Sequence, residues 1–516
     1  MPDVLLGQAY YLRFDPKLWQ AQQPFAPLGA LYAASCLRMD GHTTVLFDAM
    51  LAQSEAEWVA ALDCERPRIA IIYEDSFNYL SKMCLLRMRQ AAQAMTAAAR
   101  ARGCSVAVSG SDATDHPESY LEAGANAVIL GEGDATVTEL VRALKNGTPL
   151  TSVAGVAFLD AQGGLQRTAT RPFIRTLDDL PHPAWDLVDV ERYRRIWRRR
   201  HGYYAMNLAT TRGCPFHCNW CAKPIYGQRY AVRSAADVVD EIAWLERDFR
   251  PDQLSVVDDV FGLQPGWVET FARLRESAGI GLRFRCLMRA DQIDGDMAQA
   301  LAAAGCRMVW MGAESGSQRI LDAMEKGTRV EQIRHAVRRL HLAGIEVGLF
   351  LQFGYPGEEW DDVEATLALV RDAAPDDIGV SVSYPLPGTK FHERVRAELG
   401  AKQNWFDSND LAMLYRATYE PEFYRALHRV VHHEFRATRY ANRLGTVAGG
   451  VRVPGLRDLR AAAAWIYHRA SLPLAERQLV ALSRRPQPKP APPRLVPLLT
   501  RVAASRPSQQ CEDAGS

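Results

Sequence analysis

Hydrophobic runs and helical periods alternate along the first 150 residues. Short β-rich runs are separated by stretches whose apolar residues recur every three or four positions. This order predicts a parallel, doubly wound sheet of the Rossmann-like kind, in which ligands bind beyond the carboxyl ends of the strands. The expected strands are 3–9, 43–49, 68–74, 105–110 and 126–133.

A second series of the same kind begins near residue 204. Its strands are joined by helical segments, one of which has Ser234 as its predicted N-cap. The pattern predicts an α/β unit that is a partial parallel (β/α)6 barrel, with its site at the carboxyl ends of the strands. The expected strands are 205–210, 253–259, 282–288, 307–316, 346–357 and 377–388.

The remaining segments are expected to connect or cover these two units. A small hairpin around Gly163 and Gly164 and a Pro-rich stretch indicate a linker. A helical region follows the barrel, and the frequent prolines after Arg484 indicate a disordered or extended tail. The predicted units are 1–150, 151–200, 201–395, 396–483 and 484–516.

Composition narrows the class of protein. Hydrophobic residues make up 48% of the 516 residues, so a large core can be buried. Lys and Arg total 61 against 60 Asp and Glu, which argues against a general nucleic-acid binder. We expect neither a signal peptide nor a membrane span, because the amino-terminal pattern is wrong for the first and no apolar run is long enough for the second.

One basic segment, 191–202, has interleaved aromatics. It could meet an acidic substrate or an anionic membrane surface. A solvated connecting helix is the interpretation that we favour, since charge runs usually face water.

Three cysteines share one loop, "TTRGCPFHCNWCAKP", with the spacing C-x3-C-x2-C. A zinc site would want four ligands, and the only spare one nearby is His217, inside the triplet. A disulfide is not expected, because the cysteine usage indicates a reduced, cytoplasmic protein. The third interpretation is a four-iron cluster held by Cys214, Cys218 and Cys221, which leaves one iron open.

The position of this loop after a barrel strand makes the stretch resemble the cluster loop of the radical S-adenosylmethionine (SAM) superfamily. The resemblance implies a [4Fe-4S] cluster whose open iron chelates SAM. One electron then splits SAM into methionine and a 5′-deoxyadenosyl radical, which removes hydrogen from an unactivated carbon. The protein orients these groups and excludes water.

Positions at the ends of the barrel strands map onto the SAM site of that superfamily. "VVDD" takes the place of a Gly-Gly-Glu-like segment but lacks its glycines, and "FGYPGE" resembles the segment that packs along adenine. The charged members could equally form structural ion pairs, which also collect at strand ends. The residues implied to contact SAM are Asp258, Asp259, Arg289, Glu314, Gly354 and Pro356, with Trp220 at the adenine.

The first unit resembles the cobalamin-binding domain of cobalamin-dependent radical SAM enzymes. The resembling stretches are "PFAPLGALYAASCLRMDGHTTVLFDA", "VSGSDAT" and "ILGEGDATVTELVRAL". The glycines in them could also merely serve turns. The residues implied to contact cobalamin are Pro27, Gly29, Ser109, Gly110, Gly131, Glu132 and Gly133.

The D-x-H-x-x-G signature, whose histidine ligates cobalt in other cobalamin proteins, is missing. The nearest match, "DGHTTV", lacks the final glycine, and we interpret His42 as a surface turn residue. The resemblance therefore implies base-off cobalamin with no histidine ligand, between the two domains.

"CNWCAKPIYG", "DDVFGLQPGW" and "SVSYPLPGTKFHERV" are similar to the subgroup of the anaerobic magnesium-protoporphyrin IX monomethyl ester cyclase. Methylation of an unactivated carbon is the favoured function. The alternatives are cyclase-like oxidation or rearrangement and a non-catalytic cobalamin or redox sensor. A methylthiotransferase would need a second cluster in the first domain, where we interpret the cysteines as buried apolar thiols at 36, 64, 84 and 104.

The partners that the resemblance implies are a small-molecule or lipid- or tetrapyrrole-like substrate and an electron donor such as flavodoxin or ferredoxin. The substrate itself is not readable. Aromatics in the helical region, Trp405, Tyr415 and Tyr424, could line its pocket, although aromatics at helical spacing are more often core.

Overall fold

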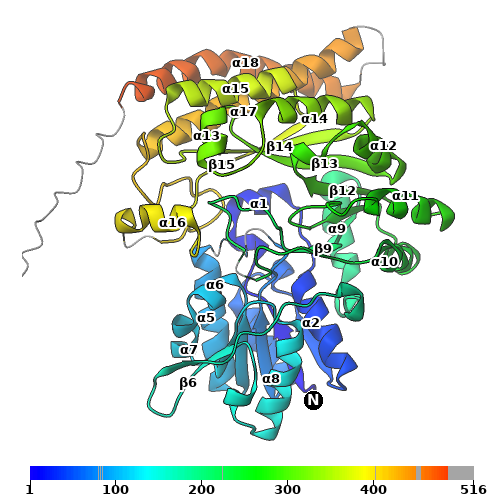
Figure 1. Cartoon of the computed structure of the whole chain (residues 1–516), viewed down its shortest axis with the longest axis vertical. Coiled ribbons are helices and arrows are strands. Elements are labelled where there is room, and N and C mark those ends of the chain that lie inside the picture. The colour runs from blue at the N-terminus through cyan, green and yellow to red at the C-terminus, as the bar shows by residue number, and fades with distance from the viewer. Residues whose placement is uncertain are drawn as a thin grey trace, which may run out of the picture.

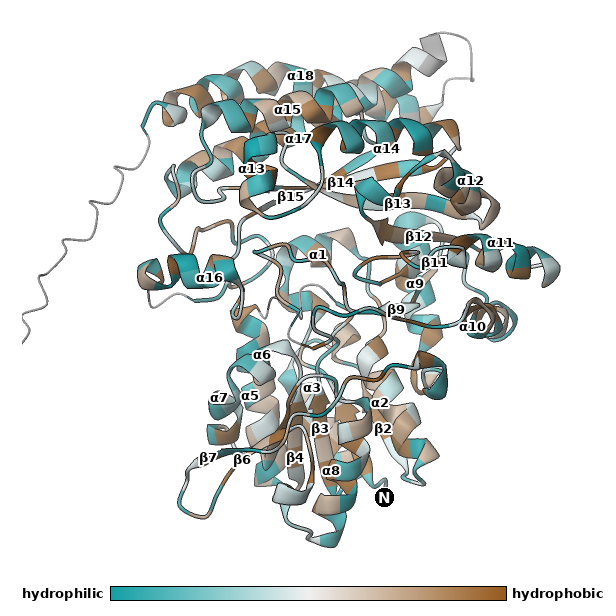
Figure 2. Ribbon diagram, in the orientation of Figure 1, coloured by the Kyte–Doolittle hydropathy of each residue, from teal (hydrophilic) through white to brown (hydrophobic). Residues whose placement is uncertain are grey.

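The computed structural model describes residues 1–485, apart from 79–80, 82, 84, 224, 401–402 and 449–454. Two α/β domains are stacked one on the other, and two long helices form an outer layer over the second domain (Figure 1). The expected strands of both sheets are mainly hydrophobic in Figure 2, and their helices turn mixed surfaces outward. The predicted tail lies almost wholly outside the described residues.

The first domain is a doubly wound sheet with the strand order β2-β1-β3-β4-β5-β6-β7. Its first five strands are parallel, and buried side chains cover both faces of the sheet, so the sequence prediction of this fold is confirmed. The strands are β1 (Val4–Gly7), β2 (Thr44–Phe47), β3 (Ile69–Tyr73), β4 (Ser105–Ser109) and β5 (Ala127–Ile129). The helices are α1 (Pro16–Ala21), α2 (Leu28–Met39), α3 (Glu55–Glu65), α5 (Leu86–Ala101), α6 (Ser111–Asp115), α7 (Pro117–Glu122) and α8 (Asp134–Asn146).

The hairpin expected within the linker forms, but it belongs to the first sheet. Strand β6 (Val156–Leu159) pairs antiparallel with β5, and β7 (Leu165–Arg167) pairs with β6. The hairpin therefore covers the edge that β5 would otherwise expose.

The second domain is an open, all-parallel sheet whose strands follow chain order, β8-β11-β12-β13-β14-β15. Because β8 and β15 do not pair, the barrel is partial, as the sequence predicts. Its strands are β8 (Ala205–Leu208), β11 (Gln253–Val256), β12 (Arg283–Met288), β13 (Cys306–Glu314), β14 (Glu346–Phe353) and β15 (Asp377–Val382). Its helices are α10 (Ala235–Asp248), α11 (Trp267–Ser277), α12 (Gly295–Ala303), α13 (Gln318–Ala323), α14 (Val330–Leu342) and α15 (Trp360–Ala373).

The basic segment forms helix α9 (Val190–His201), but it is more than a solvated connector. Trp197 is fully buried, and its Nε1 donates to the Pro24 carbonyl at 2.7 Å. The Tyr193 hydroxyl donates to Asp48 at 2.7 Å. Arg195, Arg198, Arg199 and Arg200 are exposed, whereas Arg194 is half-buried and donates to the Phe249 carbonyl, so the helix packs onto the first domain through aromatics and leaves most of its charge in water.

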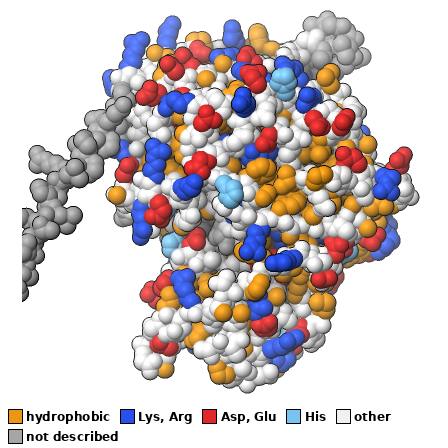
Figure 3. Space-filling view, viewed as in Figure 1, with side chains coloured by type: hydrophobic (Ala, Val, Ile, Leu, Met, Phe, Trp, Pro, Cys, Tyr) orange, Lys and Arg blue, Asp and Glu red, His pale blue; other side chains and the backbone are white. Residues whose placement is uncertain are grey.

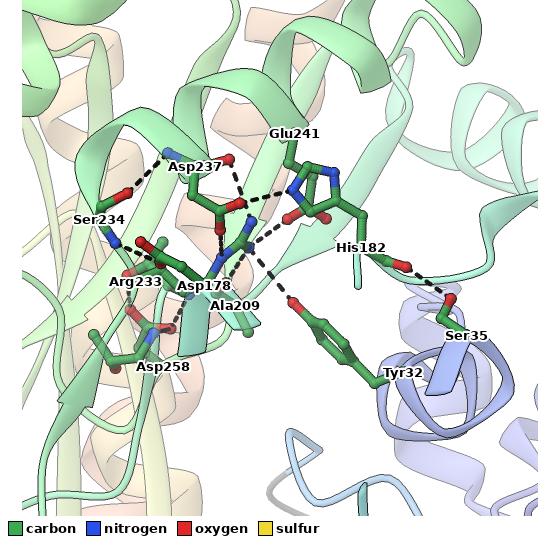
Figure 4. A network of polar contacts seen from close by, with 12 residues as sticks. Tyr32, Ser35, Asp178, His182, Ala209, Arg233, Ser234, Asp237, Glu241 and Asp258 are labelled. Carbon is green, nitrogen blue, oxygen red and sulfur yellow. Dashed lines mark hydrogen bonds and ion pairs between the residues drawn. The ribbon is translucent and has the colours of Figure 1, made fainter. Parts of the chain in front are cut away.

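A buried arginine connects the start of α10 to the first domain (Figure 4). Arg233 pairs with Glu241, whose side chain is 0% exposed, and with Asp237. It also donates to the Ala209 carbonyl at 2.9 Å and to the Tyr32 hydroxyl at 3.5 Å. Glu241 is buried where water cannot replace this partner, so its charge depends on Arg233.

The linker joins the same network. Nε2 of His182 lies 3.1 Å from Asp237, and the His182 carbonyl accepts from Ser35 on α2 at 2.7 Å. The Oγ of Ser234 accepts from the Asp237 amide at 3.1 Å, which confirms its prediction as the N-cap of α10. One polar network therefore spans the first domain, the linker and the barrel.

In the C-terminal region, α17 (Pro421–Ala448) and α18 (Leu456–Ser483) cover the far side of the barrel, whereas α16 (Lys390–Val395) lies beside the cysteine loop. Trp405, Tyr415 and Tyr424 are all buried in the main hydrophobic core. The core interpretation of these aromatics is therefore the one that the structure supports, and the pocket interpretation is not.

Two of these aromatics, Tyr415 and Tyr424, lie beside the turn after β14 that contains a buried carboxyl. The amide of Gly354 donates to one oxygen of Glu358 at 2.5 Å, and the Tyr415 hydroxyl donates to the Gly354 carbonyl. The other Glu358 oxygen is buried without a partner among the described residues. Burial raises the pKa of Glu358 to about 8.

Two further sequence interpretations are wrong. His42 is buried rather than a surface turn residue: its Nε2 lies 3.2 Å from Asp40, and its amide donates to the Leu37 carbonyl near the end of α2 at 3.0 Å. Among the thiols interpreted as buried, Cys36 and Cys104 are buried, whereas Cys64 is exposed at the end of α3. Cys84 lies outside the described residues.

In the part of the chain that the structure describes, no helix combines the length and hydropathy needed to cross a bilayer.

We predict that Arg233→Met destabilises the protein by ~3–5 kcal/mol, because Glu241 loses its ion-pair partner while remaining buried. Thermal melting measures the effect. Arg247→Met is the matched control, since Arg247 pairs with Asp248 in an exposed position and its loss should leave the melting temperature unchanged. Equal melting temperatures for the two variants would contradict the assignment.

Glu358→Gln should stabilise the protein increasingly as pH rises from 5.5 to 8. The folded-state pKa lies above the ordinary value of 4.5, so the folded protein retains a proton that the unfolded chain releases. Wild-type stability therefore falls across this window by about 1.4 kcal/mol for each pH unit, and the neutral amide avoids the fall. The difference in melting temperature between variant and wild type, measured at both pH values, tests this.

Glu364→Gln on the exposed face of α15 provides the control, with the same small difference expected at both pH values. A Glu358→Gln difference that is independent of pH would overturn the assignment of a protonated carboxyl.

Candidate functional site

The loop that contains the three cysteines leaves β8 at the carboxyl end of the barrel. A buried carboxylate fixes its start: Asp258 accepts from the Thr210 amide at 2.7 Å, from the Thr210 hydroxyl at 2.5 Å and from the Thr211 amide at 3.0 Å. Burial raises the pKa of Asp258 to about 6, although these donors oppose the shift. Asp258 therefore orients the backbone that leads to Cys214.

Gly213 allows the loop to turn immediately before the first cysteine. Its φ is +78°, and a Cβ there would lie 2.4 Å from the Arg229 carbonyl. No larger residue fits without moving the backbone. The loop then returns through β10 (Ala231–Val232), which pairs with β9 (Thr211–Arg212).

Two side chains that the sequence analysis did not single out hold the loop in shape. Lys223 Nζ donates to the Phe216 carbonyl at 2.8 Å, within the loop. Asn219, between the second and third cysteines, donates through Nδ2 to the Ala323 carbonyl at 2.8 Å and accepts from the Tyr355 hydroxyl at 2.9 Å. The only sequence signal for these roles is their place inside the motif.

The three thiols lie in environments of different polarity. Cys218 is buried, whereas Cys214 and Cys221 are half-buried. Burial raises the pKa of Cys221 to about 12 and also raises that of Cys214. An iron–sulfur cluster takes thiolates, so binding it would displace these protons.

A cation adjoins the buried thiol. Arg289 Nη1 lies 3.9 Å from the Cys218 sulfur, and its guanidinium stacks 3.7 Å from the centre of the Phe216 ring. Arg289 also pairs with Asp291 at 2.8 Å. This positive charge suits a bound thiolate, so the donor set and its surroundings fit a cluster held by three cysteines.

Among the described residues, no three Cys, His, Asp or Glu side chains form a set that could hold a single metal ion. A cubane binds thiolates at separate corners, so its three sulfurs need not converge on one point.

A strained carboxylate stands at the end of β13, next to the cysteine loop. Glu314 has a φ of +59°, which is uncommon for a residue other than glycine. It pairs with Lys326 at 2.8 Å, and both side chains are buried. Burial lowers the pKa of Lys326, but the charges of Glu314 and Cys218 outweigh it, so the pKa lies above its ordinary value. Strained polar residues at strand ends are typical of ligand sites.

Trp220 completes this corner. Its ring centre lies 5.9 Å from Lys326 Nζ, and its indole N–H is buried without a partner among the described residues. A buried donor without a partner indicates that something else accepts from it. The residues Glu314, Lys326 and Trp220 therefore fit a polar ligand beside the cysteines.

Of the other predicted SAM contacts, Asp259 lies beside the cysteine loop, and Gly354 and Pro356 lie in the turn after β14. Asp259 is exposed, and its charge raises the pKa values of Cys214 and Cys221, which places it beside the loop. Gly354 packs against Tyr424, since a Cβ there would lie 3.2 Å from that ring, and Pro356 is half-buried in the next turn. The structure thus gives Asp258 and Gly354 clear structural roles, and their contacts with SAM stay predictions.

The carboxyl edge of the first sheet faces this loop. Asn207 on β8 donates to the Ala26 carbonyl at 2.9 Å, next to the predicted residues Pro27 and Gly29. The Gly29 amide in turn donates to Asp75 at 3.1 Å. The Pro-rich first loop therefore lies between the two domains.

Glycines at the same edge have close protein neighbours. Gly110, which follows Ser109, has a φ of +140°, and a Cβ there would lie 2.6 Å from Glu74 Cβ. A Cβ at Gly133 would lie 2.5 Å from the Tyr73 hydroxyl, whereas Gly131 has only a carbonyl 3.8 Å away. Packing therefore explains Gly110 and Gly133, and Gly131 leaves the most room for a ligand.

A buried arginine crosses from the cysteine loop to the first domain. Arg212 lies 2.6 Å from both Glu132 and Asp134, and each of the three side chains is at most 6% exposed. Three aromatic rings, at 5.3 to 5.8 Å, surround its guanidinium: Tyr32, Phe77 and Tyr226. Glu132 thus has an interdomain partner, which the sequence analysis did not foresee, and its contact with cobalamin stays a prediction.

One orphaned group at this edge supports a ligand there. Glu74 accepts from the Ala9 amide at 2.8 Å through one oxygen, while its other oxygen is buried without a partner among the described residues. Burial raises the pKa of Glu74 to about 8. A carboxyl that keeps its proton can donate to an amide oxygen, and amide side chains surround the corrin ring of cobalamin. The site fits that cofactor.

His42 precedes β2, so it lies at the amino ends of the strands and far from this edge. His116, which follows α6, lies instead on the interface side. The absence of a histidine ligand to cobalt stays a prediction.

A cavity of about 330 Å³ opens between the domains beside α16. Asp115 and His116 line it from the first domain, and His392 and Tyr384 line it from the barrel side. Burial raises the pKa of Asp115 to about 7, with help from the Asp112 charge, and burial lowers the pKa of His116. The Phe391 amide donates to the Asn219 carbonyl at 3.0 Å, so the cavity adjoins the cysteine loop.

The family model of the Radical SAM superfamily matches residues 208–370. The uncharacterized methyltransferase PH0819 of Pyrococcus horikoshii is 29% identical over 54% of this chain and 60% of its own length. Cytidylyl-2-hydroxyethylphosphonate methyltransferase of Streptomyces wedmorensis is 25% identical over 61% of this chain and 64% of its own length. The chain thus spans less than two thirds of either relative.

Among solved structures, the cobalamin-dependent S-adenosylmethionine radical enzyme OxsB, with aqua-cobalamin and S-adenosylmethionine bound, has a similar fold. The TM-score is 0.69 and the identity 16%, and the match covers 93% of this chain and 72% of that one. Residues 208–370 of the chain therefore resemble the Radical SAM superfamily, and the two-domain fold is similar to that of OxsB.

Proposed function

We propose that this protein is a cobalamin-dependent radical SAM enzyme that methylates an unactivated carbon. One observation carries the proposal: the loop with Cys214, Cys218 and Cys221 is held at the carboxyl end of the barrel while Arg212, two residues earlier, is bound to the carboxyl edge of the first sheet. The two predicted cofactor sites therefore face each other. The fold of OxsB and the two methyltransferase relatives support this proposal.

When bound, the cluster would supply the electron that cleaves SAM to a 5′-deoxyadenosyl radical, and cobalamin would supply the methyl group. The cysteines would hold the cluster, and Arg289 would offset the charge of the Cys218 thiolate. Glu314 and Lys326 are suited to the amino and carboxylate groups of SAM, because they place one negative and one positive charge at the same corner. Trp220 and the turn at Pro356 would pack along the adenine.

The interdomain cavity is the place where we expect the substrate. Asp115 can gain or lose a proton near neutral pH, because burial raises its pKa to about 7, whereas burial lowers the pKa of His116 and favours its neutral form. They would hold a polar group of the substrate while the barrel and first domain exclude water.

The thiols fit a reducing, cytoplasmic location. Cys286 and Cys306 are both buried, with their sulfurs 4.0 Å apart, and a reducing compartment would keep such a pair as thiols. An electron donor such as flavodoxin or ferredoxin would be needed to reduce the cluster.

Cyclase-like oxidation is the second candidate, because sequence similarity extends to the anaerobic magnesium-protoporphyrin IX monomethyl ester cyclase of Synechocystis, at 28% identity over 41% of the chain. Product mass separates the two: methylation adds one methyl group and forms S-adenosylhomocysteine, whereas cyclisation does neither.

We predict that Cys218→Ser lowers bound iron and abolishes 5′-deoxyadenosine formation, because one corner of the cluster loses its thiolate. Anaerobic reconstitution, followed by iron analysis and chromatography of the SAM products under strong reductant, measures both. Cys64→Ser, at an exposed position outside the site, should retain iron and SAM cleavage. Wild-type protein that binds iron but cleaves no SAM would instead support a non-catalytic sensor.

Glu314→Gln should weaken SAM binding by about tenfold or more, because a charge-assisted hydrogen bond to the amino group is lost. The iron content should not change, since Glu314 does not hold the cluster. Equilibrium binding of SAM to reconstituted protein provides the measurement. Glu325→Gln, which removes an exposed partner of Lys390 nearby, is the control and should bind SAM normally. Loss of iron in Glu314→Gln would show a structural role instead.

A further inference from the structure

Helix α18 carries hydrophobic residues on two opposite faces. One face packs on α17 through buried side chains that include Leu472 and Leu479. The opposite face is exposed: Leu459 is 70% exposed, Ile466 is 60% and Leu474 is 74%. A helix that is apolar on all sides is normally enclosed by other segments. The outer face of α18 is instead exposed and has no partner among the described residues.

The exposed residues form a continuous stripe. Leu459, Ile466 and Leu474 are spaced by seven and eight residues, which returns each to the same side of an α-helix. Ala463 and Ala470 occupy the turns between them and are also exposed. Tyr467 flanks the stripe and is 61% exposed, whereas Trp465, which is 37% exposed, lies toward the face that packs on α17. We call this set of residues the α18 stripe.

Basic side chains border the α18 stripe. Arg460, Arg469 and Arg477 are exposed, and none of them forms an ion pair with another described residue. Glu476 is the exposed acidic residue of this helix. Figure 3 shows hydrophobic and basic side chains, with some acidic ones, along the upper edge of the molecule, where Figure 1 places α18.

We propose that the α18 stripe docks on an anionic phospholipid surface, with the helix lying in the plane of the membrane interface. Three properties match such a helix: an apolar stripe, the aromatic Tyr467 at its border and flanking arginines. Aliphatic side chains would enter the boundary between headgroups and acyl chains, while arginines would contact lipid phosphates.

A second copy of this chain fits the stripe less well. A symmetric helix pair would bring Arg460, Arg469 and Arg477 of one copy toward the same residues of the other, with few carboxylates to offset them. An anionic surface neutralises the same arginines. Charge complementarity therefore selects the membrane.

The test is cosedimentation of the full chain with vesicles. We expect binding to vesicles of equal parts phosphatidylglycerol and phosphatidylcholine, little binding to pure phosphatidylcholine, and weaker binding as salt increases. Replacing Arg460, Arg469 and Arg477 together by glutamine should weaken binding on the order of a hundredfold. Ile466→Glu with Leu474→Glu should abolish it, and these exposed substitutions leave the fold intact.

Met39→Glu is the matched control. Met39 is 70% exposed at the end of α2, on the opposite end of the molecule from α18, and its substitution should leave vesicle binding unchanged. Binding that ignores lipid charge, or that survives the Ile466→Glu and Leu474→Glu changes, would overturn the proposal.

Two other occupants of the stripe give different results. If a second copy covers it, the wild-type chain sediments as a dimer that Ile466→Glu dissociates, and vesicle binding is absent. If residues 486–516 cover it, only a chain ending at Arg485 binds vesicles. Either result rejects the membrane as the partner of the full chain.

Discussion

The buried ion triad of Arg212 with Glu132 and Asp134 is the interaction on which the rest of the site depends. Arg212 stands two residues before Cys214, and its two partners follow β5 in the first domain. Charges in such a dry setting are costly unless all partners are present, so the triad is satisfied in one arrangement of the two domains. The aromatic rings around the guanidinium exclude water and sharpen that dependence. The cysteine loop and the first sheet are thereby held face to face.

Smaller interactions then orient the loop from the barrel side. Asp258 holds the backbone before the first cysteine, and Asn219 connects the middle of the loop to α13 and β14. The contacts come from segments that follow three different strands, β11, β13 and β14, so the site forms where several parallel strands end together. Lys326 and Glu314 place a buried pair of opposite charges at the same edge.

Strand and helix periodicity predicted both domains because parallel strands are buried on both faces and their helices are amphipathic. It did not predict that the 156–167 hairpin joins the first sheet, since an edge pairing depends on which strand is left exposed. It also missed that α9 packs through Trp197 and Tyr193, because the arginines dominate the composition of that segment. The sequence analysis also misjudged the exposure of Cys64 and the burial of His42. Hydrophobic periodicity does not predict the burial of a single residue at the end of a helix or strand.

The cysteine spacing by itself determined the class of site, because the distances between three thiols in one short loop are set by the chain that joins them. The partners of that loop were decided by tertiary structure alone. Arg212 and Glu132 are 80 positions apart, and Glu314 and Lys326 acquire their pairing only when β13 ends beside the loop. Local spacing can encode a ligand set, whereas burial and charge pairing arise when distant segments pack together.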